Sequence, residues 1–332
     1  MFPFNVYLLA ILSAFALAFG TMPLWEKFCL RIGLMDDPGH RKIHDRPVPL
    51  AGGLAVTTGL VVPTLIASLF LLLQGHLEKF EVLGANSAFP LLHGLARRHT
   101  ELTGILLGAL GMLLLGILDD KHELKPAVKF TGQFLIAFAV AACGLRITLF
   151  VPNPIFHYTV TILWILTVIN AFNFMDNMNG LCTGLGAIGS WCFAMIAAGD
   201  GQYLVTIVAL LTFGALLGFL PFNFPNGRAF LGDAGSHLVG YLLAVLAILP
   251  HFYSIRHPRH WAVMIPLLVL AVPLLDMIQV VTVRWRLGKP FYHGDTNHLS
   301  HRLVQLGLSK STAVIILWLA SALLASLALL LN

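Results

Sequence analysis

Apolar runs of about 20 residues recur from one end of this chain to the other, and each is long enough to cross a hydrocarbon core of roughly 30 Å. Since backbone amides inside a bilayer must be hydrogen-bonded within the protein, these runs are predicted to be helices. Charged residues make up only 11% of the 332 residues, against roughly a quarter in soluble domains. The pattern excludes a water-soluble globular fold.

The predicted fold class is all-α: one polytopic membrane helix bundle over residues 1–332, with no internal repeat. The first run lacks the cationic start of a signal peptide, so we expect it to be a retained helix. Ten spans are expected, at about 4–25, 50–73, 102–118, 127–145, 155–172, 180–198, 203–221, 234–253, 261–283 and 312–331.

The loops between the spans alternate between two faces, and one face carries most of the charge. Its loops lie at about 26–49, 119–129, 173–179, 222–233 and 284–311, and they hold 14 of the 20 lysines and arginines. The positive-inside rule places these loops in the cytoplasm and both termini outside. The same side holds 11 of the 15 acidic residues, ten in these loops and Asp276 inside the ninth span, and that rule does not explain them. A face rich in both signs of charge indicates a reaction centre.

Net charge and cysteines point to no further partner. The net charge of +5 fits basic loops against an anionic membrane surface, so no nucleic acid is expected. The four cysteines have no metal-like spacing, and we expect buried, inert thiols at Cys29, Cys143, Cys182 and Cys192.

Two cytoplasmic stretches carry charges suited to phosphate and metal. Arg41, Lys42 and His44 offer hydrogen-bond donors to phosphate, although an ordinary positive-inside loop would look the same. Asp119 and Asp120 end the third predicted span. Adjacent carboxylates repel each other, and either Mg²⁺ bridging to a diphosphate or ion pairs with the following lysines would relieve the repulsion.

A third stretch places amides and a carboxylate at the mouth of an apolar helix, at Asn170, Asn173, Asp176, Asn177 and Asn179. Such groups are costly at the membrane boundary unless they have partners. Because an Asn side chain can contact a nucleobase edge or a Mg²⁺ ion, we interpret this stretch as part of a binding site.

The last two stretches stand near the ends of the chain's later spans. Asp233 begins a span, where a helix N-terminus favours negative charge, and Asn223 precedes it. His298 and His301 are three residues apart and share a helix face, next to Arg302. The pair has no third ligand for zinc, so contacts to phosphate or a lipid head group are the preferred interpretation.

In order and spacing, these five stretches resemble the polyprenyl-phosphate N-acetylhexosamine-1-phosphate transferase superfamily (glycosyltransferase family 4), over about residues 30–305. The nearest branch is the bacterial one that uses UDP-N-acetylglucosamine and undecaprenyl phosphate. That branch's opening pattern, D-x-P, R-K-x-H and P-x-P-x-x-G-G, is present at Asp36, Pro38, Arg41, Lys42, His44, Pro47, Pro49, Gly52 and Gly53.

The resemblance implies a role for each matching residue. It implies catalytic roles for Asp119, Asp120, Asp176 and Lys129, and a Mg²⁺ site, with Mn²⁺ as a substitute, at Asp233 and Asn173. The substrate contacts expected alongside are Arg41, Lys42, His44, Asn179, Asn223, Phe230, His298, His301 and Arg302, with Phe230 near the uracil. The active site is then formed by loops 31–49, 119–129, 170–180, 222–236 and 284–305. A homodimer is an expectation from the resemblance alone.

Two motifs depart from the family pattern. The family's D-G-x-D-G is Asp176-Asn177-Met178-Asn179-Gly180 in this chain, so the second carboxylate is an amide. The family's H-x-H-H-R is His298-Leu299-Ser300-His301-Arg302, with one histidine missing. The missing histidine argues against the peptidoglycan translocase branch, which remains the alternative within the family.

The expected reaction is attack by the lipid phosphate on the β-phosphorus of a UDP-sugar, which yields a lipid-linked diphosphate sugar for cell-envelope polysaccharides and UMP. A phosphate monoester is mostly dianionic at pH 7, so no general base is needed and no phospho-aspartate is expected. Asp276, inside the ninth predicted span, is expected to make a polar contact within the bundle, with direct substrate contact as the alternative.

Two other classes also place carboxylates in a helix bundle. An ion-coupled transporter would hold them near the bilayer midplane between repeated halves. An intramembrane aspartyl protease needs two aspartates that face each other, whereas adjacent ones on a helix point about 100° apart. The identity of the sugar, the pathway and the polyprenyl chain stay open at this point.

Overall fold

The computed structural model describes residues 4–37, 46–78, 89–250, 252, 260–290, 292 and 295–332. Apart from two short strands, its regular elements are helices, so the predicted all-helical membrane bundle is confirmed. The helices are α1 (Phe4–Ile32), α2 (Gly52–Glu78), α3 (Phe89–His122), α4 (Pro126–Ala142), α5 (Pro154–Met175), α6 (Leu181–Gly199), α7 (Tyr203–Asn223), α8 (Gly232–Leu246), the 3₁₀ helix η1 (His260–Met264), α9 (Ile265–Val269), α10 (Ala271–Arg286), α11 (Leu299–Gln305) and α12 (Lys310–Leu331). The strands β1 (Met35–Asp36) and β2 (Val48–Pro49) pair antiparallel.

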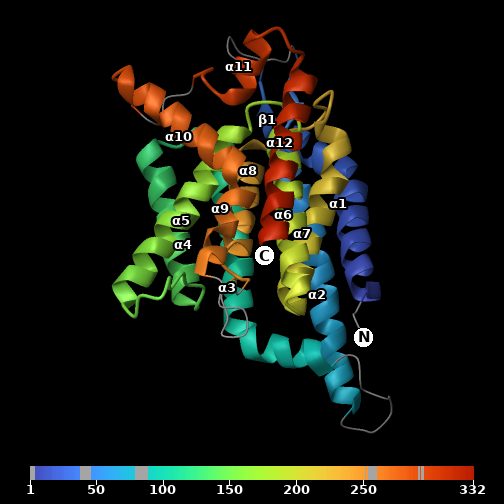
Figure 1. Cartoon of the computed structure of the whole chain (residues 1–332). Coiled ribbons are helices and arrows are strands. Elements are labelled where there is room, and N and C mark those ends of the chain that lie inside the picture. Colours follow the sequence, from blue (N-terminus) through green and yellow to red (C-terminus); the bar gives the residue numbers. More distant parts are fainter. Residues whose placement is uncertain are drawn as a thin grey trace.

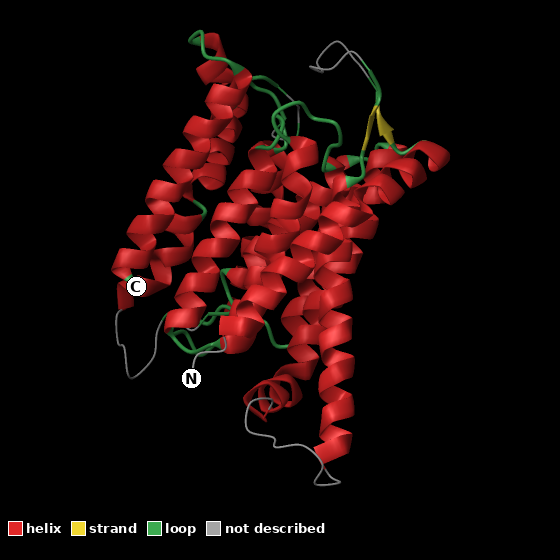
Figure 2. Cartoon of the chain, turned by 90° about the vertical axis from the view of Figure 1, so that its right-hand side faces the viewer, coloured by secondary structure: helices red, strands yellow, loops and turns green. Residues whose placement is uncertain are grey.

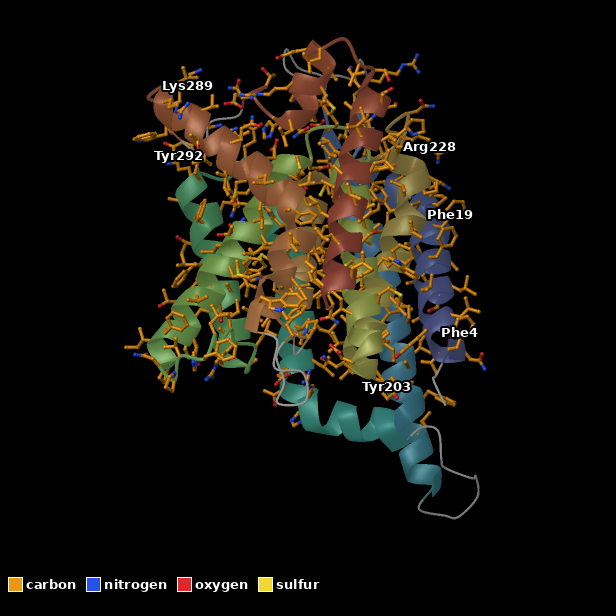
Figure 3. All side chains as sticks on the ribbon, viewed as in Figure 1. Phe4, Phe19, Tyr203, Arg228, Lys289 and Tyr292 are labelled. Carbon is orange, nitrogen blue, oxygen red and sulfur yellow. The ribbon has the colours of Figure 1, made fainter. Side chains whose placement is uncertain are left out.

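The long helices stand side by side, and α11 and the two strands lie at one end of the bundle (Figure 1). We call this end the α11 face: it carries α11, the β1–β2 pair and the C-terminal ends of α3, α5 and α7. Both chain ends lie toward the opposite face (Figure 2). Arg228 and Lys289 lie near the α11 face, whereas Tyr203 lies at the other end (Figure 3). The loops that the charge pattern predicted to share a side therefore do so.

Helix α8 is the centre of the bundle. Its residues from Ala234 to Leu246 are all buried, and it packs against α3 and α5. Close approach requires small residues on the neighbours as well as on α8, because a methyl group on Gly116 of α3 would overlap the backbone of Ala234. On α8 itself, a Cβ on Gly240 would lie 2.7 Å from the Cα of Ile169 in α5. This packing fixes the depth at which the first turn of α8 meets the α11 face.

The expected count of ten full-length spans is too high for the described residues. Seven of their helices are long and apolar enough to cross a membrane, or eight if the bent pair η1–α9 and α10 is one span. The other two predicted spans are helical but short: α4 has 17 residues and α8 has 15. At about 1.5 Å per residue, α8 is roughly 22 Å long. It can be short because protein, not lipid, surrounds it.

Two helices bend sharply. The axis turns by 74° between η1–α9 and α10. Pro273 lies four residues after Val269 and has no N–H to offer that carbonyl, which favours a break at this point. The backbone of α3 is non-helical at Arg98 (φ −112°, ψ 17°), and the segment before it runs across the base of the bundle in Figure 1.

The four cysteines are free thiols, as predicted. Cys29, Cys182 and Cys192 are buried, and Cys143 is half-buried.

Candidate active site

Four helix ends bring two carboxylates, a lysine and an amide together on the α11 face. Lys129 Nζ, near the start of α4, lies 2.7 Å from Asp119 Oδ2 and 3.2 Å from Asp233 Oδ1. Asn173, near the end of α5, donates from Nδ2 to Asp233 Oδ1 and, at 2.9 Å, to Ser236 Oγ. We call Asp119, Lys129, Asn173 and Asp233 the carboxylate cluster. Asp233 is its most open acid, with 32% of its side chain exposed against 7% for Asp119. A ligand would therefore reach the cluster through Asp233.

A tight turn between α3 and α4 places Lys129 over Asp119. Asp119 Oδ1 accepts the N–H of Leu124 at 3.0 Å, and its carbonyl accepts the N–H of Glu123 at 2.8 Å. Pro126 then starts α4, where its missing N–H is not needed. One aspartate thus shapes the turn with one oxygen and holds the lysine with the other.

Asp120 has a different role from its neighbour, because it caps α8. Its two carboxylate oxygens accept the backbone N–H groups of Asp233 (2.7 Å) and Ala234 (3.0 Å). Gly232 has a φ of +67°, and a Cβ there would lie 2.7 Å from Asp120 Oδ2. A carboxylate at a helix N-terminus satisfies free amides and complements the helix dipole. Asp120 therefore positions Asp233 through the backbone.

Beneath the cluster lies a polar layer of Asn170, which the sequence pointed to, and of Gln133 and His237, which were not predicted. Gln133 Nε2 lies 3.3 Å from His237 Nε2, and Gln133 Oε1 accepts from Asn170 Nδ2 at 2.9 Å. His237 is fully buried, and its Nδ1 has no hydrogen-bond partner within the described part of the chain. A signal was present in the sequence: His237 follows Asp233 by four residues, and Gln133 follows Lys129 by four, so each pair shares a helix face.

The donor set suits a divalent cation. Ligand atoms of Asp119, Asp233 and His237 all lie within 4.8 Å of one another. Carboxylate oxygens are the usual ligands of Mg²⁺, so the two aspartates fit such an ion, and an imidazole nitrogen of His237 lies close enough to be a third donor. Asn173 presents its amide nitrogen to Asp233. To act as the predicted second ligand, it would have to turn its amide oxygen toward the ion.

Asp176 directly follows α5 and is half-buried beside the cluster. Burial, with the neighbouring carboxylates of Asp233, Asp120 and Asp36, raises the pKa of Asp176 well above its usual range. A carboxyl group with a raised pKa takes up a proton or a cationic partner easily, so Asp176 is suited to hold a proton or to face a cation.

The three predicted residues His298, His301 and Arg302 lie at the start of helix α11, on the α11 face of the bundle. His298 Nδ1 lies 2.7 Å from the fully buried Asp276 Oδ2, so Asp276 makes the polar contact within the bundle that its position predicted. His301 is half-buried, and burial and the nearby His298 lower its pKa. Arg302 is exposed.

A salt bridge secures the segment that leads into α11. Arg284 is buried at the end of α10, and its Nε and Nη2 lie 3.1 and 3.3 Å from the two carboxylate oxygens of Asp295. Burial alone would raise the pKa of Asp295, but hydrogen bonds from Arg284 and Asn297 outweigh it and lower that pKa to about 2.

Asn223 is buried, and other parts of the protein occupy its amide. Its Oδ1 accepts from Gly180 N (3.0 Å) and Thr183 Oγ1 (2.7 Å), and its Nδ2 donates to Ala229 O at 3.0 Å. This geometry favours a brace between loops over a contact to substrate. Asn179 is more open, and its Nδ2 donates to Pro225 O at 3.1 Å.

Phe230 joins the loop before α8 to the N-terminal strands. Its N–H donates to Pro49 O at 3.1 Å, and its carbonyl accepts from Gly52 N at 2.9 Å. The predicted phosphate contacts Arg41, Lys42 and His44 lie outside the described residues, in the segment that joins β1 to β2.

Comparison with known proteins identifies the family. Residues 102–251 match the pattern of Glycosyl transferase family 4. A Bacillus subtilis protein named probable undecaprenyl-phosphate N-acetylglucosaminyl 1-phosphate transferase is 31% identical over 305 residues, which cover 90% of this chain and 77% of the relative. The chain belongs to glycosyl transferase family 4. The whole carboxylate cluster lies within the matched residues, so the predicted resemblance is confirmed on the part of the fold that builds the site.

Two further relatives match this chain over a similar share of its length. The decaprenyl-phosphate N-acetylglucosaminephosphotransferase of Mycobacterium tuberculosis is 28% identical over 341 residues, which cover 94% of this chain and 79% of the relative. The undecaprenyl-phosphate alpha-N-acetylglucosaminyl 1-phosphate transferase of Escherichia coli is 27% identical over 324 residues, which cover 92% and 78%. The polyprenyl chain in these names differs, whereas the sugar in them is the same.

Proposed function

We propose that this chain transfers N-acetylglucosamine 1-phosphate from UDP-N-acetylglucosamine to undecaprenyl phosphate, in the bacterial inner membrane and on its cytoplasmic side. One observation carries the proposal: in a member of glycosyl transferase family 4, Lys129 bridges Asp119 and Asp233 at the mouths of α3, α4 and α8. The names of the similar proteins from three bacteria support the choice of sugar and of a polyprenyl acceptor.

The reaction exchanges one phosphate bond for another. An oxygen of the lipid phosphate forms a bond to the β-phosphorus of the UDP-sugar. The bond from that phosphorus to the bridging oxygen breaks, and the bridging oxygen leaves with UMP. The lipid phosphate arrives already charged at neutral pH, so its attack needs no base. The protein's task is to position both phosphates and to neutralise their charge.

The residues of the cluster are suited to that task. Lys129 pairs with both carboxylates, and the substrate diphosphate would compete with them for its ammonium group. Asp119 lies 2.7 Å from the same ammonium and would set its direction. Arg302 is exposed on α11 and would add a second positive charge for the phosphates.

Asp233, with Asp119 and the oxygen of Asn173, would hold a Mg²⁺ ion. When bound, the ion would neutralise charge on the diphosphate, as it does in other phosphoryl transfers. If Asp233→Asn kept full Mg²⁺-dependent turnover, Asp233 would not be the metal ligand.

The test is UMP release from purified protein with Mg²⁺, undecaprenyl phosphate and a panel of UDP-sugars. The proposal predicts release only when UDP-N-acetylglucosamine and the lipid are both present. Release with UDP-MurNAc-pentapeptide alone would assign the chain to the peptidoglycan translocase branch. Release with another UDP-HexNAc would keep the chemistry and change the sugar, and no release with any of them from folded protein would reject the proposal.

A further inference from the structure

Helix α11 has only seven residues, too few to be stable without outside contacts. Part of its support comes from α10. Asp276 accepts the backbone N–H of Leu299 at 2.6 Å and also holds His298. Gln279 Nε2 donates to the carbonyl of Asn297 at 2.8 Å. These contacts fix where α11 begins, but not how it rotates toward the carboxylate cluster.

A second attachment comes from the turn that follows α5. Ser300 Oγ donates to Asn177 Oδ1 at 2.6 Å, and Ser300 is fully buried. Asn177 Nδ2 in turn donates to the carbonyl of Phe174 at 2.6 Å, which fixes the orientation of the amide. The chain thereby links residues 123 positions apart in sequence. Both Asn177 and Ser300 stand where this chain departs from the family pattern.

Phe174, near the end of α5, also contacts the start of α11. The Phe174 ring lies edge-on to the His298 ring, with centroids 6.0 Å apart. The Arg284 guanidinium also contacts the Phe174 ring, 4.9 Å from its centroid. The α5 end therefore meets α11 through an aromatic contact at His298 and a hydrogen bond at Ser300. Two points of contact define an orientation, whereas one would allow rotation.

We propose that Asn177 and Ser300 act as a positioning pair that orients α11, and with it His301 and Arg302, over the carboxylate cluster. The inference rests on the proposed function, in which Arg302 adds a positive charge for the substrate phosphates. Asn177 stands at the first glycine of the family's D-G-x-D-G and Ser300 at a histidine of its H-x-H-H-R, and the hydroxyl at 300 is short enough to be fully buried against the amide at 177. Neither residue touches the reacting atoms in this scheme, because both act through α11.

The direct test is amide hydrogen exchange of the purified protein without substrate. Losing a buried hydrogen bond weakens an attachment by roughly 0.5–1.5 kcal/mol, so exchange over 299–305 should rise about three- to tenfold in Ser300→Ala. Asn177→Ala should raise it to the same level, and the double variant should exceed neither single variant by more than about twofold. Unchanged exchange in Ser300→Ala, or effects that multiply in the double variant, would contradict the pair.

Kinetics then separate positioning from simple support. We expect KM for UDP-N-acetylglucosamine to rise about three- to tenfold in both single variants, with kcat within about twofold, because the pair affects binding groups only. Increased exchange with an unchanged KM would show that the pair holds α11 without positioning the substrate groups, which overturns the proposal. The exchange experiment needs no substrate, so it stands even if the donor sugar proves different.

Ser309→Ala is the matched control. Ser309 is exposed and caps α12 by accepting the N–H of Thr312 at 3.1 Å. The same chemical change is made a few residues further along the chain, outside the attachment. Exchange over 299–305 and KM should both match the wild type in this variant. A change as large as that of Ser300→Ala would mean that any lost hydroxyl near α11 has the effect.

Discussion

At the scale of single residues, the decisive feature is how two acidic side chains coexist near a membrane surface. Asp119 and Asp233 share the ammonium group of Lys129, with nitrogen–oxygen distances of 2.7 and 3.2 Å. Without that cation, two carboxylates would repel each other in a half-buried setting where water screens them poorly. Lys129 thus stabilises the ligand-free cluster and is also the charge that a diphosphate would attract.

Removing this charge should affect the reaction strongly. We expect Lys129→Met to lower kcat/KM about 10²- to 10³-fold, the usual effect of losing one preorganised group that stabilises developing charge. Lys125→Met is the control, because Lys125 is exposed four residues earlier and should change kcat/KM by less than about twofold. Steady-state UMP release measures both. Equal losses in the two variants would point to general surface charge rather than to the cluster.

At the scale of elements, the site depends on how the first turn of α8 is held against the end of α3. Asp120 uses both oxygens for this contact, and Gly232 and Gly116 leave the space for it. The paired aspartates therefore have different roles: Asp119 forms an ion pair with Lys129, and Asp120 caps the N-terminus of α8.

Asp120→Ala should consequently be a stability defect as well as an activity defect. We expect it to lower the free energy of unfolding by about 1–2 kcal/mol, the usual effect of losing a helix cap, and Asp120→Asn to lower it by less because one acceptor remains. Thermal unfolding in detergent measures this, with the exposed Glu123→Ala as the control. An unfolding midpoint unchanged in Asp120→Ala would contradict the capping role.

The Arg284–Asp295 salt bridge gives a prediction about acid. The pKa of Asp295 falls from 3.8 to about 2 in the folded protein, so the bridge stabilises the fold fully above pH 4 and loses that effect as the pH falls toward 2. The free energy of unfolding should thus be higher for wild type than for Asp295→Asn at about pH 5, and the difference between the two should be smaller at about pH 2.5. If that difference in the free energy of unfolding stayed constant from about pH 5 to about pH 2.5, the charge of Asp295 would not contribute to stability.

The sequence predicted the helices and the members of the cluster, but not all of their partners. Hydropathy is a local property, so the long spans could be found, whereas the short α8 was taken for a full span because its apolar residues face protein instead of lipid. Lys129 and Asp233 are 104 residues apart and meet only through packing of α3, α4 and α8. The family resemblance assigned both residues to the site but did not predict their contact. His237 was signalled only by its place four residues after Asp233, and no sequence pattern pointed to the contact of Ser300 with Asn177.

At the scale of the whole molecule, the charged loops gather on one face and both termini lie toward the other (Figures 1 and 2). Exposed Lys289 follows α10 toward the α11 face, and exposed Val151 lies in the loop between α4 and α5. The positive-inside rule puts the first in the cytoplasm.

Single cysteines at these two positions, in a chain whose native cysteines are replaced, test this orientation. An impermeant maleimide added to intact spheroplasts should label Val151→Cys, and it should label Lys289→Cys only in inverted vesicles. Labelling of Lys289→Cys in intact spheroplasts would place the active site on the wrong side for a cytoplasmic nucleotide sugar.

The most direct test of the central claim follows the β-phosphate itself. Purified protein is incubated with UDP-N-acetylglucosamine labelled with ³²P at the β-phosphate, with and without undecaprenyl phosphate. The account predicts that the label moves into the lipid phase only when the acceptor lipid is present, with one UMP released for each label transferred and none on the protein. Label recovered as free sugar phosphate, or bound to the protein without acceptor, would contradict direct transfer between the two phosphates.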